Sequence, residues 1–564
     1  MASPDEKNTL LSPQLHPAKP LPFELVQHVA IFFEEKLHTQ ALSILLNSLS
    51  AYPDASKPIF IPSPQHLALA ATFLVHPSTT ARPKTAEEEE APNVSLRLLR
   101  LVNSLFGPLT AQFSTAFLFT HFETSRHGGR RHNDDATRST PVGERKLLNL
   151  DRDIDTDLAQ SASVWSRAED FWHAVGWTFN CAVLHPARWE RWRIWLEFMC
   201  EVLEDDWNER LKIKEKDPSK NEKVLRESLI VHYIKGSSVG FGRNRRILRA
   251  IFADGGPTAV NEFREVFHNE LKLSRKKDPK EKDRKRREEA IAVNIDEEQY
   301  GDFYMASDDE ESSSGRESKR PRRSIAATTN TASKRSKRKT TTKANPDKTA
   351  LSTPDMATAA SLLGDITALA LRQRLLHLLS TVSQSLPSDF MDLQDLYHLF
   401  VENIRPLPLP IYQSFVSPLA LPYFSPAAQT TLCEYLLFRM RENAAPATDE
   451  DYLNQSKLET CFLPYAAASS SLSDNAKMSI TLEALVILLV DSHMLRVTDE
   501  LKYLVKQGII KRAEKAQAET RKNQLARLHE DLEWSWLCES AERLTFLVEE
   551  LVPSSAANSE STGS

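Results

Sequence analysis

Tryptophan is concentrated in one short stretch of this chain, and that stretch constrains the fold more than any other feature. Seven of the nine tryptophans fall between Trp165 and Trp207. A packed tryptophan buries on the order of 200 Å², so this stretch must hold much of the core. From Val164 to Phe179 the apolar residues recur at spacings of three and four, which predicts a helix. Ser163 is placed to cap its first turn.

Pro186 predicts a second helix that starts near Ala187, because proline suits a first helical turn. Apolar residues cover this helix except for a stripe that we expect to be solvated, which runs through Arg193, Glu197, Glu201 and Glu204. A helix this apolar must be covered by neighbouring helices, so core packing is the favoured interpretation. The alternative is a partly open aromatic groove for a partner helix or a stacked base, flanked by Arg188, Arg191 and Arg193.

Composition and periodicity favour helices throughout. The 564 residues include only 15 glycines, which disfavours β-sandwiches and dinucleotide-binding folds. Helical spacing of apolar residues recurs at both ends of the chain, no alternating strand pattern stands out, and no fixed repeat period is visible. The sequence therefore predicts an all-α protein with an irregular stacked-helix, α-solenoid-like architecture, in two halves joined by a long disordered linker.

Shifts in composition set the expected boundaries. We expect an N-terminal helical domain over 21–274, a charged linker over 275–352, a C-terminal helical domain over 353–552, and disordered tails at 1–20 and 553–564. Two mobile insertions are expected in the first domain, at about 77–92 and 125–160. The first of these carries the acidic run Glu87–Glu90, which we expect in an exposed loop.

The linker carries the most specific motif. From 306 to 350 Ile325 is the only large aliphatic residue and no aromatic occurs, so the segment cannot bury enough surface to offset chain ordering. Two basic clusters separated by ten residues resemble a bipartite nuclear-import signal, which binds two acidic pockets of the import receptor at once. The alternatives are a linker that is merely basic and one whose lysines neutralise nucleic-acid phosphates. The clusters comprise Lys319, Arg320, Arg322, Arg323, Lys334, Arg335, Lys337, Arg338 and Lys339.

Shorter motifs in exposed segments point to regulation. Ile291, Val293 and Ile295 precede three acidic residues, a pattern typical of a SUMO-interacting strand. Ser307 precedes an acidic run and resembles a site for an acid-directed kinase. Three further candidate phosphorylation sites each precede a proline: Ser12, Thr140 and Thr353.

A glycine-rich basic turn is the candidate anion site. Five of the 15 glycines lie between Gly236 and Gly256, and backbone amides at a helix start can hold a phosphate. The candidate contacts to an anion or to nucleic acid are Arg243, Arg245, Arg246 and Arg249. The spacing matches neither a P-loop nor a dinucleotide motif, so an ordinary interhelical loop is the competing interpretation.

One short motif suggests an enzymatic hypothesis. Gly236 to Gly240 match G-x-S-x-G, with Ser238 as the nucleophile, after the apolar run 229–234. A hydrolase elbow requires a strand before and a helix after this turn, whereas the flanks here have helical spacing. We therefore predict no enzymatic activity and keep a serine hydrolase as an alternative.

Cysteines and apolar runs narrow the class further. The five cysteines are scattered and lack disulfide or zinc spacing. Cys181, His185 and Cys200 would lack a fourth ligand, so we expect buried thiols and no metal or cofactor. No apolar run is long enough to cross a membrane.

Charge placement completes the functional expectation. The chain carries −6 and residues 272–343 carry +7, which leaves −13 for the remainder and argues against broad coating of DNA by the folded parts. The sequence predicts a non-catalytic nuclear scaffold that binds partner proteins through helical grooves, within a chromatin, DNA-maintenance or repair, or transcription complex. The import receptor would be a further partner, and the alternative is a nucleic-acid-binding protein that uses the Arg243–Arg249 turn and the linker.

Overall fold

The computed structural model describes residues 15–50, 57–120, 154–216, 221–237, 242–272, 363–418, 423–446, 452–517 and 524–551. These residues contain 21 α-helices, one π-helical turn and two short strands. The all-α prediction is confirmed.

Thirteen helices and both strands precede residue 273. They are β1 (Ala18–Pro20), α1 (Phe23–Glu34), α2 (His38–Ser50), β2 (Ile59–Ile61), α3 (Pro64–Phe73), α4 (Pro77–Thr80), α5 (Ala86–Thr110), α6 (Phe113–Ala116), α7 (Val164–Arg167), α8 (Phe171–Leu184), α9 (Pro186–Lys216), α10 (Asn221–Arg226), α11 (Leu229–Gly236), α12 (Arg243–Ile251) and α13 (Pro257–Glu262).

The remaining helices follow residue 362. They are α16 (Ile366–Ser385), α17 (Leu393–Ile404), α18 (Leu409–Val416), α19 (Pro426–Met440), α20 (Gln455–Cys461), α21 (Leu472–Asp491), α22 (Asp499–Gln517), α23 (Gln524–Phe546) and the π-helical turn η3 (Leu547–Leu551). We call residues 15–272 the N-terminal segment and residues 363–551 the C-terminal segment.

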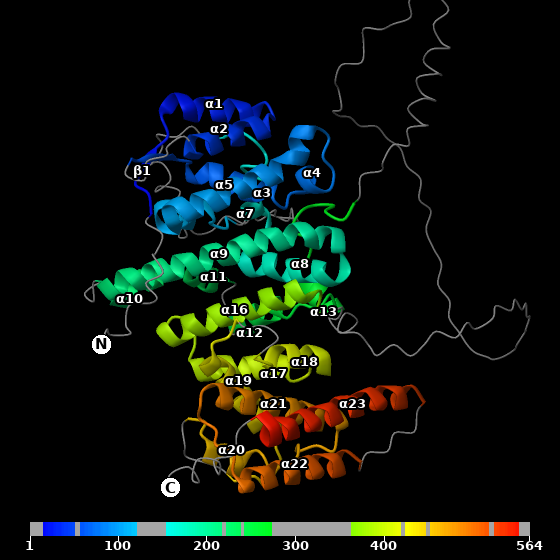
Figure 1. Ribbon diagram of the computed structural model, residues 1–564. Helices are drawn as coiled ribbons and strands as arrows, with labels where there is room; N and C mark the ends of the chain where they lie inside the picture. Colours follow the sequence, from blue (N-terminus) through cyan, green and yellow to red (C-terminus); the bar gives the residue numbers. More distant parts are fainter. Residues whose placement is uncertain are drawn as a thin grey trace, which may run out of the picture. The chain divides into compact units, whose positions relative to one another are not determined.

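The helices of both segments stack in successive layers (Figure 1). From α1 and α2 the layers run through α5, then α8 and α9, then α16 and α12, then α17 and α18, and finally α21, α23 and α22. The 31-residue helix α9 contacts α5 on one side and α16 on the other. The predicted irregular stack is therefore present.

The two segments belong to one compact unit, which comprises 1–273 and 354–564, and 274–353 form the second unit. Helix α16 of the C-terminal segment buries residues on almost every side. A helix of this kind needs covers on several faces, and α9 supplies one of them. Arg374 of α16 pairs with both carboxylate oxygens of Glu204 on α9, at 2.5 and 2.6 Å.

The tryptophans are core residues, as predicted. Trp172, Trp192, Trp195 and Trp207 are almost fully buried. The Trp165 ring stacks on Phe117 with centroids 4.8 Å apart. The alternative of an open aromatic groove finds no support here, because these rings are buried.

The boundaries of the tryptophan helices were predicted in part. The second helix begins at Pro186, as expected, but the first is interrupted after Arg167. Ser163 accepts a hydrogen bond from the Ser166 amide at 3.2 Å, and Asp170 then caps α8 by accepting from the His173 amide at 2.7 Å. A second strong N-cap inside the apolar pattern restarts the helix.

Two predicted irregular regions prove to be ordered. The acidic run Glu87–Glu90 forms the start of α5 rather than a loop, since carboxylates are favoured at a helix N-terminus and Thr85 caps this helix. Residues 18–20 of the expected tail pair in parallel with β2, and the His16 amide donates to the Leu105 carbonyl at 2.8 Å. Most of the expected insertion 125–160 lies outside the described residues.

Helix α13 ends at Glu262. Beyond it Phe263, Val266 and Phe267 are buried in a series of turns. Phe263 packs directly over Gly176 of α8. The chain leaves the helix here, and the turns allow these three side chains to be buried.

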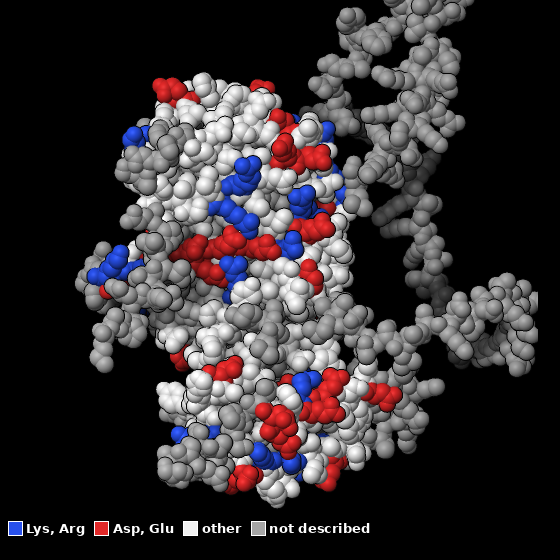
Figure 2. Space-filling model, in the orientation of Figure 1, with Lys and Arg blue, Asp and Glu red and all other residues white. Residues whose placement is uncertain are grey.

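The stripe of α9 that we expected to be solvated is half-buried, so it is less exposed than predicted. Glu201 pairs with Arg100 of α5 at 2.9 Å, and Glu204 pairs with Arg374. In Figure 2 acidic side chains form a band at the level of α9, with basic side chains on both sides. Arginines of neighbouring helices therefore pair with two carboxylates of this stripe, which stays partly open to solvent.

Candidate functional site

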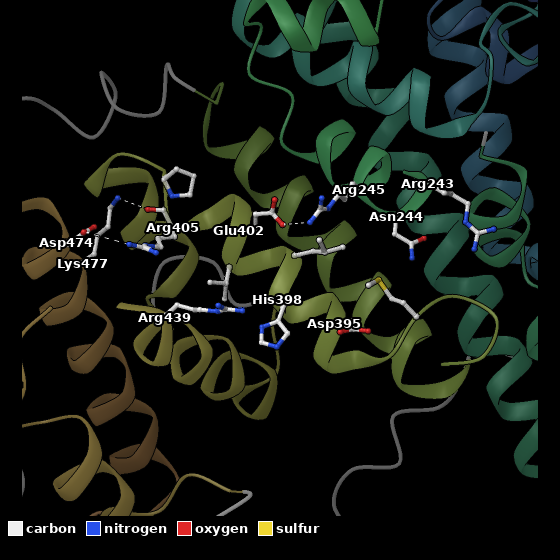
Figure 3. Close-up of a pocket in the computed structure, with 14 residues that line it drawn as sticks. Arg243, Asn244, Arg245, Asp395, His398, Glu402, Arg405, Arg439, Asp474 and Lys477 are labelled. Carbon is white, nitrogen blue, oxygen red and sulfur yellow. Dashed lines mark hydrogen bonds and ion pairs between the residues drawn. The ribbon is translucent and has the colours of Figure 1, made fainter. Parts of the chain in front are cut away.

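A charged groove with a volume of about 1120 Å³ lies where α12 meets the C-terminal segment (Figure 3). The N-terminal segment contributes the start of α12, and the C-terminal segment contributes α17 with its flanks, the end of α19 and the start of α21. Its lining residues are Arg243, Asn244, Arg245, Met391, Asp395, His398, Leu399, Val401, Glu402, Arg405, Pro406, Arg439, Asp474 and Lys477.

The groove has an excess of positive charge. Five of its lining side chains are arginine or lysine and three are aspartate or glutamate, in a chain whose formal net charge is −6. Two carboxylates are already paired: Glu402 with Arg245 at 3.3 Å and Asp474 with Arg405 at 3.9 Å. After these two pairs are formed, some basic side chains of the lining still have no carboxylate partner.

Among the described residues, Arg243 on α12 and Arg439 on α19 have no carboxylate partner, and Arg439 is exposed. Asp395 likewise has no basic partner within the described part of the chain. Two buried polar atoms of the lining also lack a hydrogen-bond partner there: Asn244 Oδ1 and His398 Nδ1. The groove thus offers unsatisfied polar groups as well as free charge.

Lys477 closes one end of the groove. Its ammonium donates to the Arg405 carbonyl at 2.7 Å, so it satisfies a free carbonyl at the end of α17. Burial lowers the pKa of Lys477, while nearby Asp474 opposes that shift. The side chain is 5% exposed, so its role is to fix α17 on α21.

The structure divides the predicted basic turn. Arg243 and Arg245 face the groove, whereas Arg246 is buried and donates to Asp170 at 2.5 Å. Arg249 makes two bonds of 2.7 Å to Glu262. Arg246 and Arg249 are therefore engaged by carboxylates within the fold, and they do not extend the surface that Arg243 and Arg245 present.

One basic residue at the start of α9 is engaged in the same way. Arg188 is buried and donates to Glu270 through Nε at 2.9 Å and Nη2 at 2.5 Å. The Trp192 indole donates to the same carboxylate at 2.6 Å. The Glu270 carboxylate thereby fastens α9 to the turns after α13. Arg193 lies 3.6 Å from Glu197 of the same helix.

The context of the G-x-S-x-G match is helical. Residues 229–234 form most of α11 rather than a strand, which removes the geometry that a hydrolase elbow requires. Ser238 itself lies outside the described residues. Gly236 and Ser237 are described, and the Ser237 hydroxyl is buried 3.4 Å from Arg246 Nη1.

Cys181, Cys200, Cys433 and Cys461 are buried thiols, as predicted, whereas Cys538 is exposed. Burial raises the pKa of Cys200 and of Cys433 to about 12, so both stay protonated at neutral pH. Within the described ranges no group of histidine, cysteine, aspartate or glutamate side chains could hold a metal ion.

Several predicted motifs lie outside the described residues. They are both basic clusters of the import signal, the segment with Ile291, Val293 and Ile295, and the candidate phosphorylation sites Ser12, Thr140, Ser307 and Thr353.

Sequence reasoning missed the half of the groove that comes from the C-terminal segment. Arg405, Arg439 and Lys477 are far apart in sequence and match no motif. No sequence signal singled them out, because even Lys477 lies in a helix that also carries Asp474, Glu483 and Asp491.

None of the described helices is long and apolar enough to span a bilayer. Comparison with models of protein families, with curated proteins and with solved structures finds no match to this chain.

Proposed function

We propose that this protein is a non-catalytic nuclear scaffold that binds partner proteins through the grooves of its helical stack. The observation that carries the proposal is the charged groove formed jointly by α12, α17, α19 and α21. Two of its guanidinium groups, those of Arg243 and Arg439, have no carboxylate partner among the described residues, so they are available to a partner of complementary charge. As a subunit it would serve a chromatin, DNA-maintenance or repair, or transcription complex.

The assembly part of the proposal is tested by size. The chain has a mass of 63.8 kDa, and in nuclear extract at physiological salt it should elute in a much larger complex. Recombinant protein run alone is the control for shape and self-association. Elution of the nuclear protein at the position of the recombinant chain would remove the scaffold proposal.

The nuclear part rests on the two basic clusters, 319–323 and 334–339. Replacing the lysines and arginines of both clusters with serine should move a fluorescent fusion from nucleus to cytosol, because each cluster supplies part of the contact with the import receptor. The matched control replaces Lys280, Lys282 and Lys285 outside the clusters. Unchanged distribution in the double-cluster variant would refute import through this signal.

A second candidate function is contact with nucleic acid. Arg243 and Arg245 favour it, since both line the groove, while the engagement of Arg246 and Arg249 by carboxylates weighs against it. Binding through phosphates falls steeply with salt. A duplex or single-strand affinity that falls in this way, and that Arg243→Ala reduces, would replace the scaffold proposal. A fluorophosphonate probe that labels Ser238 would revive the hydrolase alternative.

A further inference from the structure

We propose that the groove between α12, α17, α19 and α21 binds an acidic segment of a partner protein, in extended form and through carboxylates. This rests on the proposed scaffold function and names the chemistry of the partner. Four features of the groove support it: its charge, the spread of its cations, its unsatisfied polar atoms and the apolar residues of its lining.

Charge selects an anionic occupant. After the pairs Arg245–Glu402 and Arg405–Asp474 are formed, Arg243 and Arg439 remain without carboxylate partners among the described residues. Both have guanidinium groups, which accept carboxylates in a planar, two-bond geometry. An acidic chain would supply the missing anions.

The distribution of these groups selects an extended occupant. In Figure 3 the charged side chains are spread along the groove, from Arg243 at one side to Arg405 and Lys477 at the other, and they do not gather around one point. A single phosphate needs several donors that converge on it. The two cations without carboxylate partners, Arg243 and Arg439, come from different helices, α12 and α19, so carboxylates at intervals along a peptide match them better than one anion does.

The unsatisfied atoms add hydrogen-bonding capacity between the cations. Asn244 and His398 each have a buried atom without a partner within the described residues. Asn244 Oδ1 can accept from a peptide N–H, and His398 Nδ1 can donate or accept according to the tautomer of the ring. A peptide backbone passing between Arg243 and Arg439 would find partners of either kind.

Part of the lining of the groove is apolar. Met391, Leu399 and Val401 line it together with Pro406, so a partner segment with apolar residues among its acids would contact them here. Among its described residues the lining has no phenylalanine, tyrosine or tryptophan on which the bases of a single strand would stack, which favours an acidic peptide over a nucleic-acid strand. The favoured occupant is therefore a protein segment.

The test measures fluorescence anisotropy of a short labelled peptide of alternating Glu and Leu with the full chain. Arg243→Glu with Arg439→Glu should weaken binding by roughly tenfold or more, because two attractive contacts become repulsive. Asp395→Asn should tighten binding, since it removes an unpaired carboxylate from the lining. Arg97→Glu on α5, also exposed, is the matched control and should leave affinity unchanged. Circular dichroism melts establish that each variant is folded.

Several results would overturn the inference. They are no binding by the wild-type chain at low salt, equal binding by the double variant and wild type, or an Arg97→Glu loss as large as that of the double variant. Displacement by inorganic phosphate at constant ionic strength would indicate a single-anion site, and tighter binding of oligothymidylate would indicate nucleic acid. The double variant is also run in the nuclear extract experiment. If the double variant still elutes in a large complex and its affinity for the peptide is unchanged, this inference is wrong and the scaffold proposal stands. If the wild-type protein in extract elutes as a monomer, the scaffold proposal is wrong.

Discussion

Arg188 in the N-terminal segment and Arg512 in the C-terminal segment are both buried, but their surroundings differ. Arg188 is paired with the buried carboxylate of Glu270. Arg512 has two backbone carbonyls, those of Leu463 and Tyr465, at 3.2 Å, and its Nε and Nη2 have no partner in the described residues. Burial lowers the pKa of Arg512 to about 10.

The comparison shows that burial of an arginine can have opposite effects on the free energy of unfolding. In the N-terminal segment the guanidinium neutralises another buried charge, so the pair depends on both members. In the C-terminal segment the guanidinium is itself the uncompensated charge, and its removal takes away an unfavourable term. The predictions below test this difference, beginning with the largest effect.

Arg188→Met should lower the free energy of unfolding by about 3–5 kcal/mol, because it leaves Glu270 buried without its counter-charge. Arg512→Met, of similar length, should change it by less than about 1 kcal/mol or increase it. Urea titration followed by circular dichroism measures both. Adding Glu270→Gln to Arg188→Met should recover part of the loss. If Arg512→Met costs as much as Arg188→Met, the proposed difference between the segments is wrong.

Gly508→Ala tests how closely α22 approaches the turn at Leu463. A Cβ at this position would lie 1.9 Å from the Leu463 carbonyl oxygen, and a backbone oxygen cannot move aside as a side chain can. The expected cost is about 1–3 kcal/mol. Gly236→Ala is the control, because its Cβ would meet nothing within 4 Å. Equal melting temperatures for the two variants would contradict the close approach.

The N-terminal segment should also be the more acid-sensitive. Burial lowers the pKa of His66 and of His76 to about 4. Below pH 6.5 the unfolded chain binds protons that the folded chain does not, so stability present above 6.5 is lost as pH falls toward 4. Each histidine contributes up to about 1.4 kcal/mol per pH unit in that window.

His66→Asn removes the contribution of one of these histidines to the pH dependence of stability. His66 Nδ1 accepts from the Ser63 amide at 3.2 Å, and an asparagine oxygen can replace it without titrating. Melting temperatures measured across this pH window should fall less for the variant than for the wild type. Identical pH profiles would show that His66 does not carry the sensitivity, and Lys57→Ala on the surface serves as the control.

The smallest effect is expected at the groove. Arg245 and Glu402 form an exposed pair, with side chains 64% and 57% exposed, and such pairs contribute about 0–1 kcal/mol. Arg245→Ala should therefore leave the urea midpoint nearly unchanged. A large destabilisation would mean that the pair holds the two segments together, and the groove would then be structural.

Sequence reasoning identified what depends on local pattern. The tryptophan core, the Ser163 cap and the start of α9 at Pro186 follow from spacing and residue type. It could not separate Arg245 from Arg246, adjacent on one helix, since only packing against Asp170 decides which is buried. The groove was equally inaccessible, because Arg439 and Lys477 join Arg243 only after two distant segments pack together.

The packing of α16 against α8 and α9 has a consequence during synthesis. Arg372 of α16 donates to the carbonyls of Ile251 and Ala253, and its guanidinium lies 4.0 Å from the centre of the Phe179 ring. Residues 273–362 are translated before this cover exists, which at about 5–20 residues per second takes roughly 5–20 seconds. For that interval the nascent chain presents an apolar face beside the ribosome, so its folding yield should depend on chaperones that shield such faces.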